Sequence, residues 1–346
     1  MMAEFQAEGG SVPSIVLMKQ VSPVWRRLIG NAGWAIPLVG IGGVAAVASL
    51  YATKWGPWLY SDGAGYIMLA RNLLAGRGLG LVRASGEFQP LSMHPPLYPL
   101  ALAGLGLTGA ELLGVARWFG AALFAFTIVI VGLAIFHLSH RPWLALAAAT
   151  VTLASPQLVR LYTGVLSEPL FIVTGFGSVL LLLVYFATPR PWALILSGLA
   201  AGLSALTRYP GVAFIGAGIL ALLLFSRSRR LVGTLSYAAM AVALNLIWLT
   251  WMSRQVGADP PREWNWNLVG LWERSEPIRG GIVAEAWKWI PFETSLGPIP
   301  YALRLAIFAL VGLAVALVLF LSLHKMDRSS MLESRPLQLV VLMALF

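Results

Sequence analysis

The chain contains no cysteine. That absence excludes a disulfide framework, a thiolate nucleophile and any metal site with cysteine ligands. Charged residues are also scarce, at 11% of the 346 residues, whereas soluble domains carry about 25%. Hydrophobic residues make up 58% of the chain, so too few polar side chains remain to cover a core in water. The composition therefore indicates a membrane protein and excludes an ordinary soluble enzyme.

Acidic residues are the rarer charged class, with 14 Asp and Glu against 24 Lys and Arg, which gives a formal net charge of +10. A basic chain can bind nucleic acid when its cations form one surface patch. Here the Lys and Arg residues stand between apolar runs instead of clustering. We therefore expect membrane lipids, and no nucleic acid, among the partners.

Long apolar runs predict an all-α fold, a polytopic transmembrane helical bundle of about eight or nine spans. The expected spans are residues 34–52, 118–136, 143–159, 170–187, 192–206, 212–225, 232–252 and 302–323, with one more beginning at Leu337. The last apolar run is too short to cross a membrane where the sequence stops. We therefore expect the chain to be truncated at its C-terminus.

Short basic links between the runs orient the bundle, because cytoplasmic loops carry an excess of Lys and Arg. Arg141, Arg190 and the 226–230 segment SRSRR occupy such links. This orientation predicts a cytoplasmic tail over residues 1–30 and one transmembrane domain over residues 31–346.

The same orientation places two long loops, residues 53–117 and 253–301, on the outer side of the membrane. Within the first loop, residues 63–75 suit an amphipathic interfacial helix that Ser61 or Asp62 caps and that Gly76 and Gly78 end. The apolar stretch 97–107 is too short to span and predicts a re-entrant or interfacial helix.

Four polar residues from separate segments fall on the predicted outer side: Asp62, His94, Glu168 and Arg208. Each has a structural alternative. Asp62 and Glu168 can cap helices, His94 can be a hydrogen-bonded loop residue, and Arg208 can form an ion pair with Glu168. The functional alternative is a carboxylate that accepts a proton or binds a metal, together with an arginine that binds phosphate.

Five short motifs around the spans resemble the GT-C superfamily of membrane glycosyltransferases. Within it they are similar to the branch of dolichyl-phosphate-mannose protein mannosyltransferases and aminoarabinose transferases. The motifs are SDGAGY at 61–66, LLAGRGL at 73–79, HPPLYPL at 94–100, LSEPLF at 166–171 and LTRYPG at 206–211. Arg117 and Trp118, near the start of the second span, fit as well. The resemblance covers about residues 30–230.

This resemblance implies a hexosyl- or pentosyltransferase with an outward-facing pocket, most simply in a bacterial cytoplasmic membrane. The implied donor is a polyprenyl-phosphate sugar, and the acceptor is a lipid, a glycan or a protein. Asp62 is implied as the base or as a ligand of Mg²⁺ or Mn²⁺, and Glu168 as a second catalytic acid. Arg208, His94 and Tyr66 are implied to bind substrate. Many relatives carry a second acid after the first-loop Asp, where this chain has Gly63, which argues against bidentate metal binding.

Two other classes of function compete with the transferase. A lipid-linked sugar flippase or another membrane transporter is the alternative, although such proteins usually show inverted repeats, and none is evident here. A non-catalytic scaffold would tolerate loss of Asp62. In the second outer loop, Trp264, Trp266 and Trp272 are candidates to contact sugar or to anchor the chain at the interface.

Overall fold

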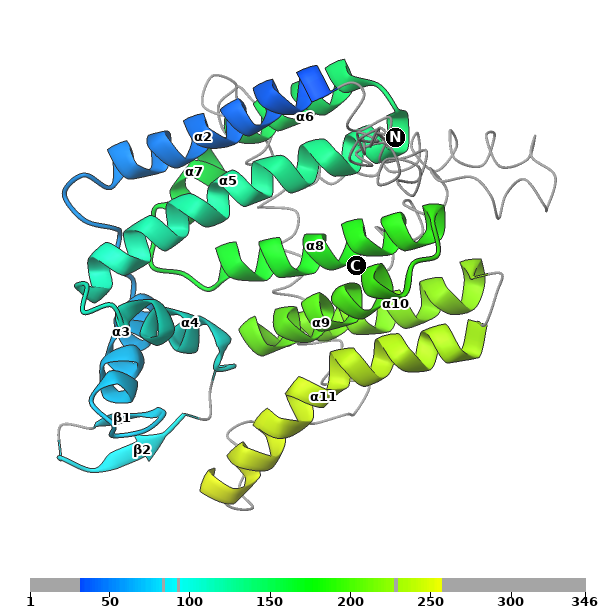
Figure 1. Ribbon diagram of the computed structural model, residues 1–346. Helices are drawn as coiled ribbons and strands as arrows, with labels where there is room; N and C mark the ends of the chain where they lie inside the picture. The colour runs from blue at the N-terminus through cyan, green and yellow to red at the C-terminus, as the bar shows by residue number, and fades with distance from the viewer. Residues whose placement is uncertain (1–31, 83–84, 92–93, 227–229, 257–346) are drawn as a thin grey trace, which may run out of the picture. The chain divides into compact units, whose positions relative to one another are not determined.

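The structure is a computed structural model that describes residues 32–256, apart from residues 83–84, 92–93 and 227–229 (Figure 1). The described residues divide into two compact units. The first unit comprises residues 32–67 and 102–173, and the second comprises residues 68–101 and 174–256. The predicted tail 1–30, the spans beyond residue 300 and most of the second outer loop lie outside the described residues.

The first unit is built on helices α2 (Ala35–Ala52), α5 (Leu112–Ser139) and α6 (Pro142–Leu153), which pack against one another (Figure 1). Small residues let the helices approach closely: a β-carbon on Gly42 would lie 3.2 Å from the carbonyl oxygen of Ala125. The core of the unit centres on fully buried Phe124, whose ring stacks on Tyr162 at 4.6 Å between centroids. Close glycine contacts of this kind are typical of helices that pack within a membrane.

The predicted span 143–159 is not one continuous helix. It is divided into α6 and α7 (Pro156–Tyr162), which are bent by 67° relative to each other. The physical reason lies at Ser155 and Pro156. Proline has no N–H to continue the helix, and Ser155 takes an extended backbone while its side chain accepts a hydrogen bond from Leu158 N.

The second unit contains α9 (Pro191–Thr207), α10 (Val212–Phe225) and α11 (Arg230–Val256), which pack against one another (Figure 1). A β-carbon on Gly202 of α9 would lie 2.5 Å from the carbonyl oxygen of Ala241 on α11. Asn245 reinforces the same contact by donating from Nδ2 to the carbonyl of Gly202 at 3.1 Å. Helix α8 (Glu168–Ala187) begins in the first unit and continues into the second.

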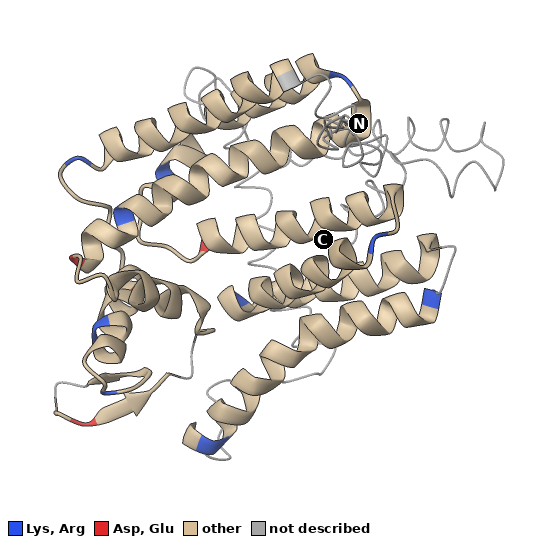
Figure 2. Cartoon of the chain, viewed as in Figure 1, with Lys and Arg blue, Asp and Glu red and all other residues tan. Residues whose placement is uncertain are grey.

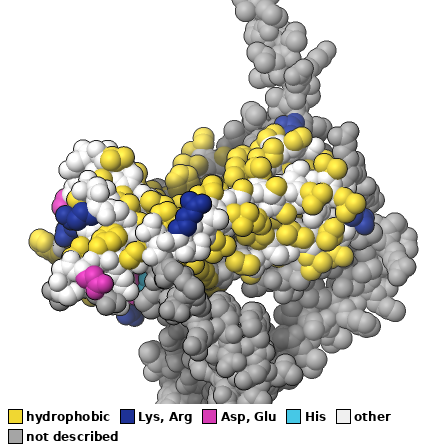
Figure 3. Space-filling view, turned by 90° about the horizontal axis from the view of Figure 1, so that it is seen from below, with side chains coloured by type: hydrophobic (Ala, Val, Ile, Leu, Met, Phe, Trp, Pro, Cys, Tyr) yellow, Lys and Arg dark blue, Asp and Glu magenta, His cyan; other side chains and the backbone are white. Residues whose placement is uncertain are grey.

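The all-α membrane fold predicted from the sequence is confirmed. In the described part of the chain, α2, α5, α8 and α11 are long and apolar enough to cross a membrane, and α6 with α7 can be counted as a fifth span. Helices α9 and α10 occupy predicted spans but are shorter. Charged residues lie at the ends of the long helices or in the links between them (Figure 2). Hydrophobic side chains cover much of the helical surface that is visible in Figure 3. The chain is therefore an integral membrane protein.

The first loop holds α3 (Ser61–Leu74), the strands β1 (Gly80–Val82) and β2 (Phe88–Pro90), and α4 (Leu97–Gly106). Helix α3 begins at Ser61, two residues before the predicted start, so Asp62 lies in its first turn. Helix α4 confirms the predicted short helix. The antiparallel hairpin of β1 and β2 was not predicted, because strands of three residues carry no alternating pattern that a sequence can reveal.

The end of α3 follows the sequence closely. Gly76 adopts φ +70°, a left-handed conformation that favours glycine, and its N–H donates to the carbonyl of Leu73 at 3.0 Å. The N–H of Arg77 donates to the carbonyl of Asn72 at 2.9 Å. Together these bonds form a Schellman motif, which satisfies carbonyls that the helix end leaves without partners. The glycine signal in the sequence therefore had the predicted effect.

Candidate active site

The segments that carry Asp62 and Glu168 pair through their backbones in the first unit. Trp58 N donates to the carbonyl of Thr163 at 3.0 Å, and Val165 N donates to the carbonyl of Trp58 at 2.9 Å. These bonds form a parallel bridge between Trp58 and Gly164. Asp62 and Glu168 each follow their bridge residue by four positions, and each lies in the first turn of a helix. The bridge therefore brings both carboxylate-bearing helix starts to the same end of the first unit.

Gly63 lies in the first turn of α3, beside this bridge. A β-carbon at position 63 would lie 2.6 Å from the carbonyl oxygen of Val165 and 3.1 Å from its β-carbon. Real β-carbons essentially never approach an atom within 3.0 Å, and here the obstacle is backbone. The structure thus gives a physical reason why this chain has glycine where many relatives of the resembled family have a second acid: only glycine lets the two segments lie this close.

Tyr66 connects the same two segments through its side chain. It is buried, with 4% of its surface exposed, and its hydroxyl donates to Oγ of Ser167 at 3.2 Å. Tyr66 lies four residues after Asp62 on α3, and Ser167 directly precedes Glu168. The bond therefore fixes the spacing between the helices that carry the two acids.

The two acids differ in their surroundings. Asp62 is exposed, and Ser61 Oγ donates to its Oδ1 at 3.5 Å. Glu168 is half-buried, and its Oε2 atom is shielded from solvent. Both carboxylates lie in the first turn of a helix, where backbone N–H groups have no partner within the helix. Asp62 is the more accessible of the two to a bound substrate.

Arg117 stabilises this end of the first unit. Its Nη2 donates to the carbonyl of Leu50 at 2.8 Å, and its Nε donates to Oγ1 of Thr53 at 3.2 Å. Both partners lie at the C-terminal end of α2, where a cation satisfies the last carbonyls and the helix dipole. The sequence placed Arg117 near the start of a span. Its two hydrogen bonds to the end of α2 could not be predicted, because Leu50 and Thr53 lie more than 60 positions earlier in the chain.

His94 and Arg208 belong to the second unit. His94 is half-buried and directly precedes Pro95 and Pro96, which lead into α4. Arg208 is half-buried and follows α9 with an extended backbone, and its N–H donates to the carbonyl of Ser204 at 3.0 Å. Of the five predicted site residues, the first unit therefore holds Asp62, Tyr66 and Glu168.

A divalent cation was predicted at Asp62. Among the described residues, no group of three His, Asp or Glu side chains lies close enough to hold a metal ion. The described carboxylates do not form a protein cage for Mg²⁺ or Mn²⁺ by themselves, so the metal stays a prediction.

Comparison with known proteins adds evidence on the fold. No family model matches the sequence, and no curated protein matches it. A solved structure does match: the protein O-mannosyltransferase Pmt1-Pmt2 complex of S. cerevisiae bound to the sugar donor, with a TM-score of 0.52 and 16% sequence identity. The match covers 64% of this chain and 33% of that chain, so the present chain spans about a third of the length of the yeast protein. Over the matched part, the chain therefore shares the fold of this membrane protein.

Proposed function

We propose that this chain is a membrane glycosyltransferase. It moves a sugar from a polyprenyl-phosphate donor to an acceptor hydroxyl on the outer side of the membrane, in a bacterial cytoplasmic membrane. The observation that supports the proposal is the backbone bridge between Trp58 and Gly164, after which Asp62 and Glu168 follow in the first turns of α3 and α8. The shared fold supports the same class of activity.

The reaction needs two kinds of group. A base must take the proton of the acceptor hydroxyl, and positive charge must stabilise the departing lipid phosphate. In our proposal Asp62 takes the proton while the acceptor oxygen attacks the anomeric carbon. The bond from that carbon to the phosphate oxygen breaks, and the lipid phosphate leaves with the electron pair. Attack from the face opposite the phosphate inverts the anomeric configuration.

The remaining predicted residues take supporting roles in this proposal. Arg208 binds the donor phosphate, because a guanidinium forms strong charge-assisted hydrogen bonds with phosphate oxygens. Glu168 acts beside Asp62 as the second acid. His94 binds substrate, while Tyr66 acts by fixing the spacing of the two acids through Ser167.

The proposal is tested by transfer of a radiolabelled sugar from a polyprenyl-phosphate donor in membranes that contain the protein. Asp62→Asn keeps the size of the side chain but removes the base, so we expect transfer to fall about 10²–10⁴-fold. Glu87→Gln is the matched control, because it neutralises an exposed carboxylate in the turn before β2 and should leave transfer unchanged. Undiminished transfer by Asp62→Asn, with protein levels equal to wild type, would reject Asp62 as the base.

One observation favours the second candidate, a lipid-linked sugar flippase or another transporter. Helices α6 and α7 form a broken pair bent by 67°, and broken helices are common in transporters. The two candidates differ in their products. Movement of a labelled lipid across sealed vesicles without a new glycosidic bond would support the transporter and contradict the transferase.

A further inference from the structure

A buried tyrosine anchors the segment that leads to Glu168. Tyr162 ends α7, and only 1% of its surface is exposed. Its ring stacks on Phe124 of α5 at 4.6 Å between centroids, and its hydroxyl shares a hydrogen bond with Oγ1 of Thr127 at 2.6 Å. Both partners on α5 are themselves buried. The side chain of Tyr162 therefore fixes the end of α7 against α5.

The backbone of Tyr162 is held as firmly as its side chain. Its carbonyl accepts a hydrogen bond from Oγ of Ser49 on α2 at 3.2 Å. A β-carbon on Gly120 of α5 would lie 2.8 Å from the same carbonyl oxygen, so only glycine lets α5 approach it this closely. Ser49 is fully buried, and its own carbonyl accepts a hydrogen bond from Oγ1 of Thr53 at 2.7 Å. Tyr162 thus connects the end of α7 to both α2 and α5.

The backbone bridge of the candidate site begins at the next residue. The carbonyl of Thr163 accepts a hydrogen bond from Trp58 N, and Val165 N donates to the carbonyl of Trp58. On the other side of the bridge, Thr53 at the end of α2 lies five residues before Trp58. Both sides of the bridge are therefore connected, within five residues, to the contact that Tyr162 makes with α2.

We propose that Tyr162 is a positioning residue. By fixing the end of α7 to α2 and α5, it sets where the bridge forms, and so where Asp62 and Glu168 lie in the first turns of α3 and α8. The inference about the bridge depends on the contacts alone, whereas the inference about catalysis rests on the proposed transferase function. Because Tyr162 is buried six residues before Glu168, it acts through the backbone and not by touching substrate.

Tyr162→Phe tests the proposal, because it removes the hydroxyl and keeps the ring that stacks on Phe124. Without the hydrogen bond the bridge should open more often, so we expect the amides of Trp58 and Val165 to exchange with deuterium about 3–10-fold faster. In transfer of a radiolabelled sugar, kcat should fall about 3–10-fold while both KM values stay constant. Thr127→Val removes the other half of the same bond, so adding it to Tyr162→Phe should cause little further change.

The second unit offers a matched control, because it also contains a fully buried tyrosine. Tyr237 lies on α11, and its hydroxyl donates to the carbonyl of Phe214 at 2.9 Å. Tyr237→Phe removes the same group from a similar environment, so it should lower the thermal unfolding temperature about as much as Tyr162→Phe does. It should leave both kcat and exchange at the bridge unchanged, which separates positioning from a general loss of stability.

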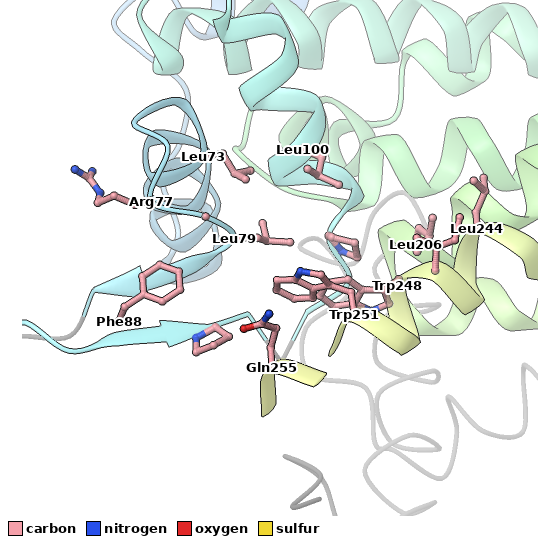
Figure 4. A pocket seen from close by; sticks show the side chains of 14 residues that line it. Leu73, Arg77, Leu79, Phe88, Leu100, Leu206, Leu244, Trp248, Trp251 and Gln255 are labelled. Atoms are coloured by element: carbon pink, nitrogen blue, oxygen red, sulfur yellow. The ribbon is translucent and has the colours of Figure 1, made fainter. Parts of the chain in front are cut away.

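The control also leaves the other features of the second unit in place. Tyr237 does not line the apolar cavity of about 640 Å³ beside the hairpin, whose wall includes Trp248 and Trp251 (Figure 4). A different side chain holds the hairpin itself: the buried amide of Asn72 donates from Nδ2 to the carbonyl of Gly80 at 2.7 Å. Loss of the Tyr237 hydroxyl therefore alters neither of them.

The two measurements separate the possible failures. Unchanged exchange at the bridge in Tyr162→Phe would overturn the positioning role, whatever the activity. Faster exchange with an unchanged kcat would overturn its link to catalysis. If the wild-type chain transfers no sugar, the proposed function fails, while exchange still tests the anchor. If Tyr162→Phe fails to fold, as judged by gel filtration and circular dichroism, Ser49→Ala removes the hydrogen bond to the Tyr162 carbonyl and decides the question by the same measurements.

Discussion

The two units hold their polar groups in different ways. In the first unit, Asp62 and Glu168 follow a backbone bridge, and a glycine contact and the Tyr66 bond fix their spacing. In the second unit, a buried amide holds the hairpin, and the described cavity beside it is apolar. In the proposed reaction the first unit supplies the carboxylates and the second unit supplies Arg208, which binds the donor phosphate.

Arg208→Ala tests the proposed binding of the donor phosphate by the second unit. Loss of charge-assisted bonds to a phosphate amounts to about 1.5–3 kcal/mol, so we expect the donor KM to rise about 10–100-fold with little change in the acceptor KM. Steady-state transfer kinetics with each substrate varied in turn measure the difference. Arg160→Ala, which removes an exposed arginine on α7, serves as the control. Equal increases in both KM values would indicate a structural role for Arg208.

Gly63→Ala tests the close approach in the first unit. The added methyl group would collide with the carbonyl of Val165, and such overpacking destabilises by about 1–3 kcal/mol. We expect a lower thermal unfolding temperature and reduced transfer. Gly65→Ala on the same helix is the control, because nothing lies within 4 Å of a β-carbon there, and its stability should stay the same or rise. Equal stability of the two variants would contradict the tight contact.

Asn72→Ala tests how the second unit holds its hairpin. The change leaves the carbonyl of Gly80 and Nε of Arg77 without their partner, which destabilises by about 1–3 kcal/mol. We expect faster hydrogen exchange over β1 and β2. Arg71→Ala removes an exposed side chain from the same helix and should leave this exchange unchanged. Unchanged exchange in Asn72→Ala would show that the hairpin is held by other contacts.

Tyr66→Phe should have the smallest effect. It removes the hydroxyl that donates to Ser167, a bond that contributes about 0.5–1.5 kcal/mol. If Tyr66 only positions the two acids, kcat should fall several-fold while both KM values stay constant. A double-mutant cycle with Ser167→Ala measures the coupling directly, and additive effects would show that the bond contributes nothing to the site.

The sequence predicted well where a local signal is strong. Apolar runs located α2, α5, α8 and α11, and the glycine at position 76 located the end of α3. The prediction from sequence missed a helix break where hydropathy and proline give opposite signals. The run 143–159 is apolar enough for one span, yet Pro156 breaks it, because a missing N–H outweighs hydropathy at that point.

The candidate site was predicted only as a set of residue types on one side of a membrane. Asp62 and Glu168 were chosen for their chemistry, and their catalytic roles stay predictions. The residues beside the two acids were harder to predict from the sequence. Tyr66 was chosen as a substrate contact because it lies in the SDGAGY motif. Gly63 was noted only because many relatives have a second acid at that position. The contacts of these two residues with Ser167 and Val165 belong to partners about 100 positions away.

By itself, the sequence determined that this protein is a helical membrane protein and determined where most of its described helices run, because hydrophobic length and glycine or proline conformation act locally. Only the tertiary structure decided which helix starts meet and where a cavity opens. Those features arise when segments distant in the sequence pack to satisfy backbone groups and to fit one another's shape. The bridge between Trp58 and Gly164 and the cavity lined by Trp248 both exist for that reason.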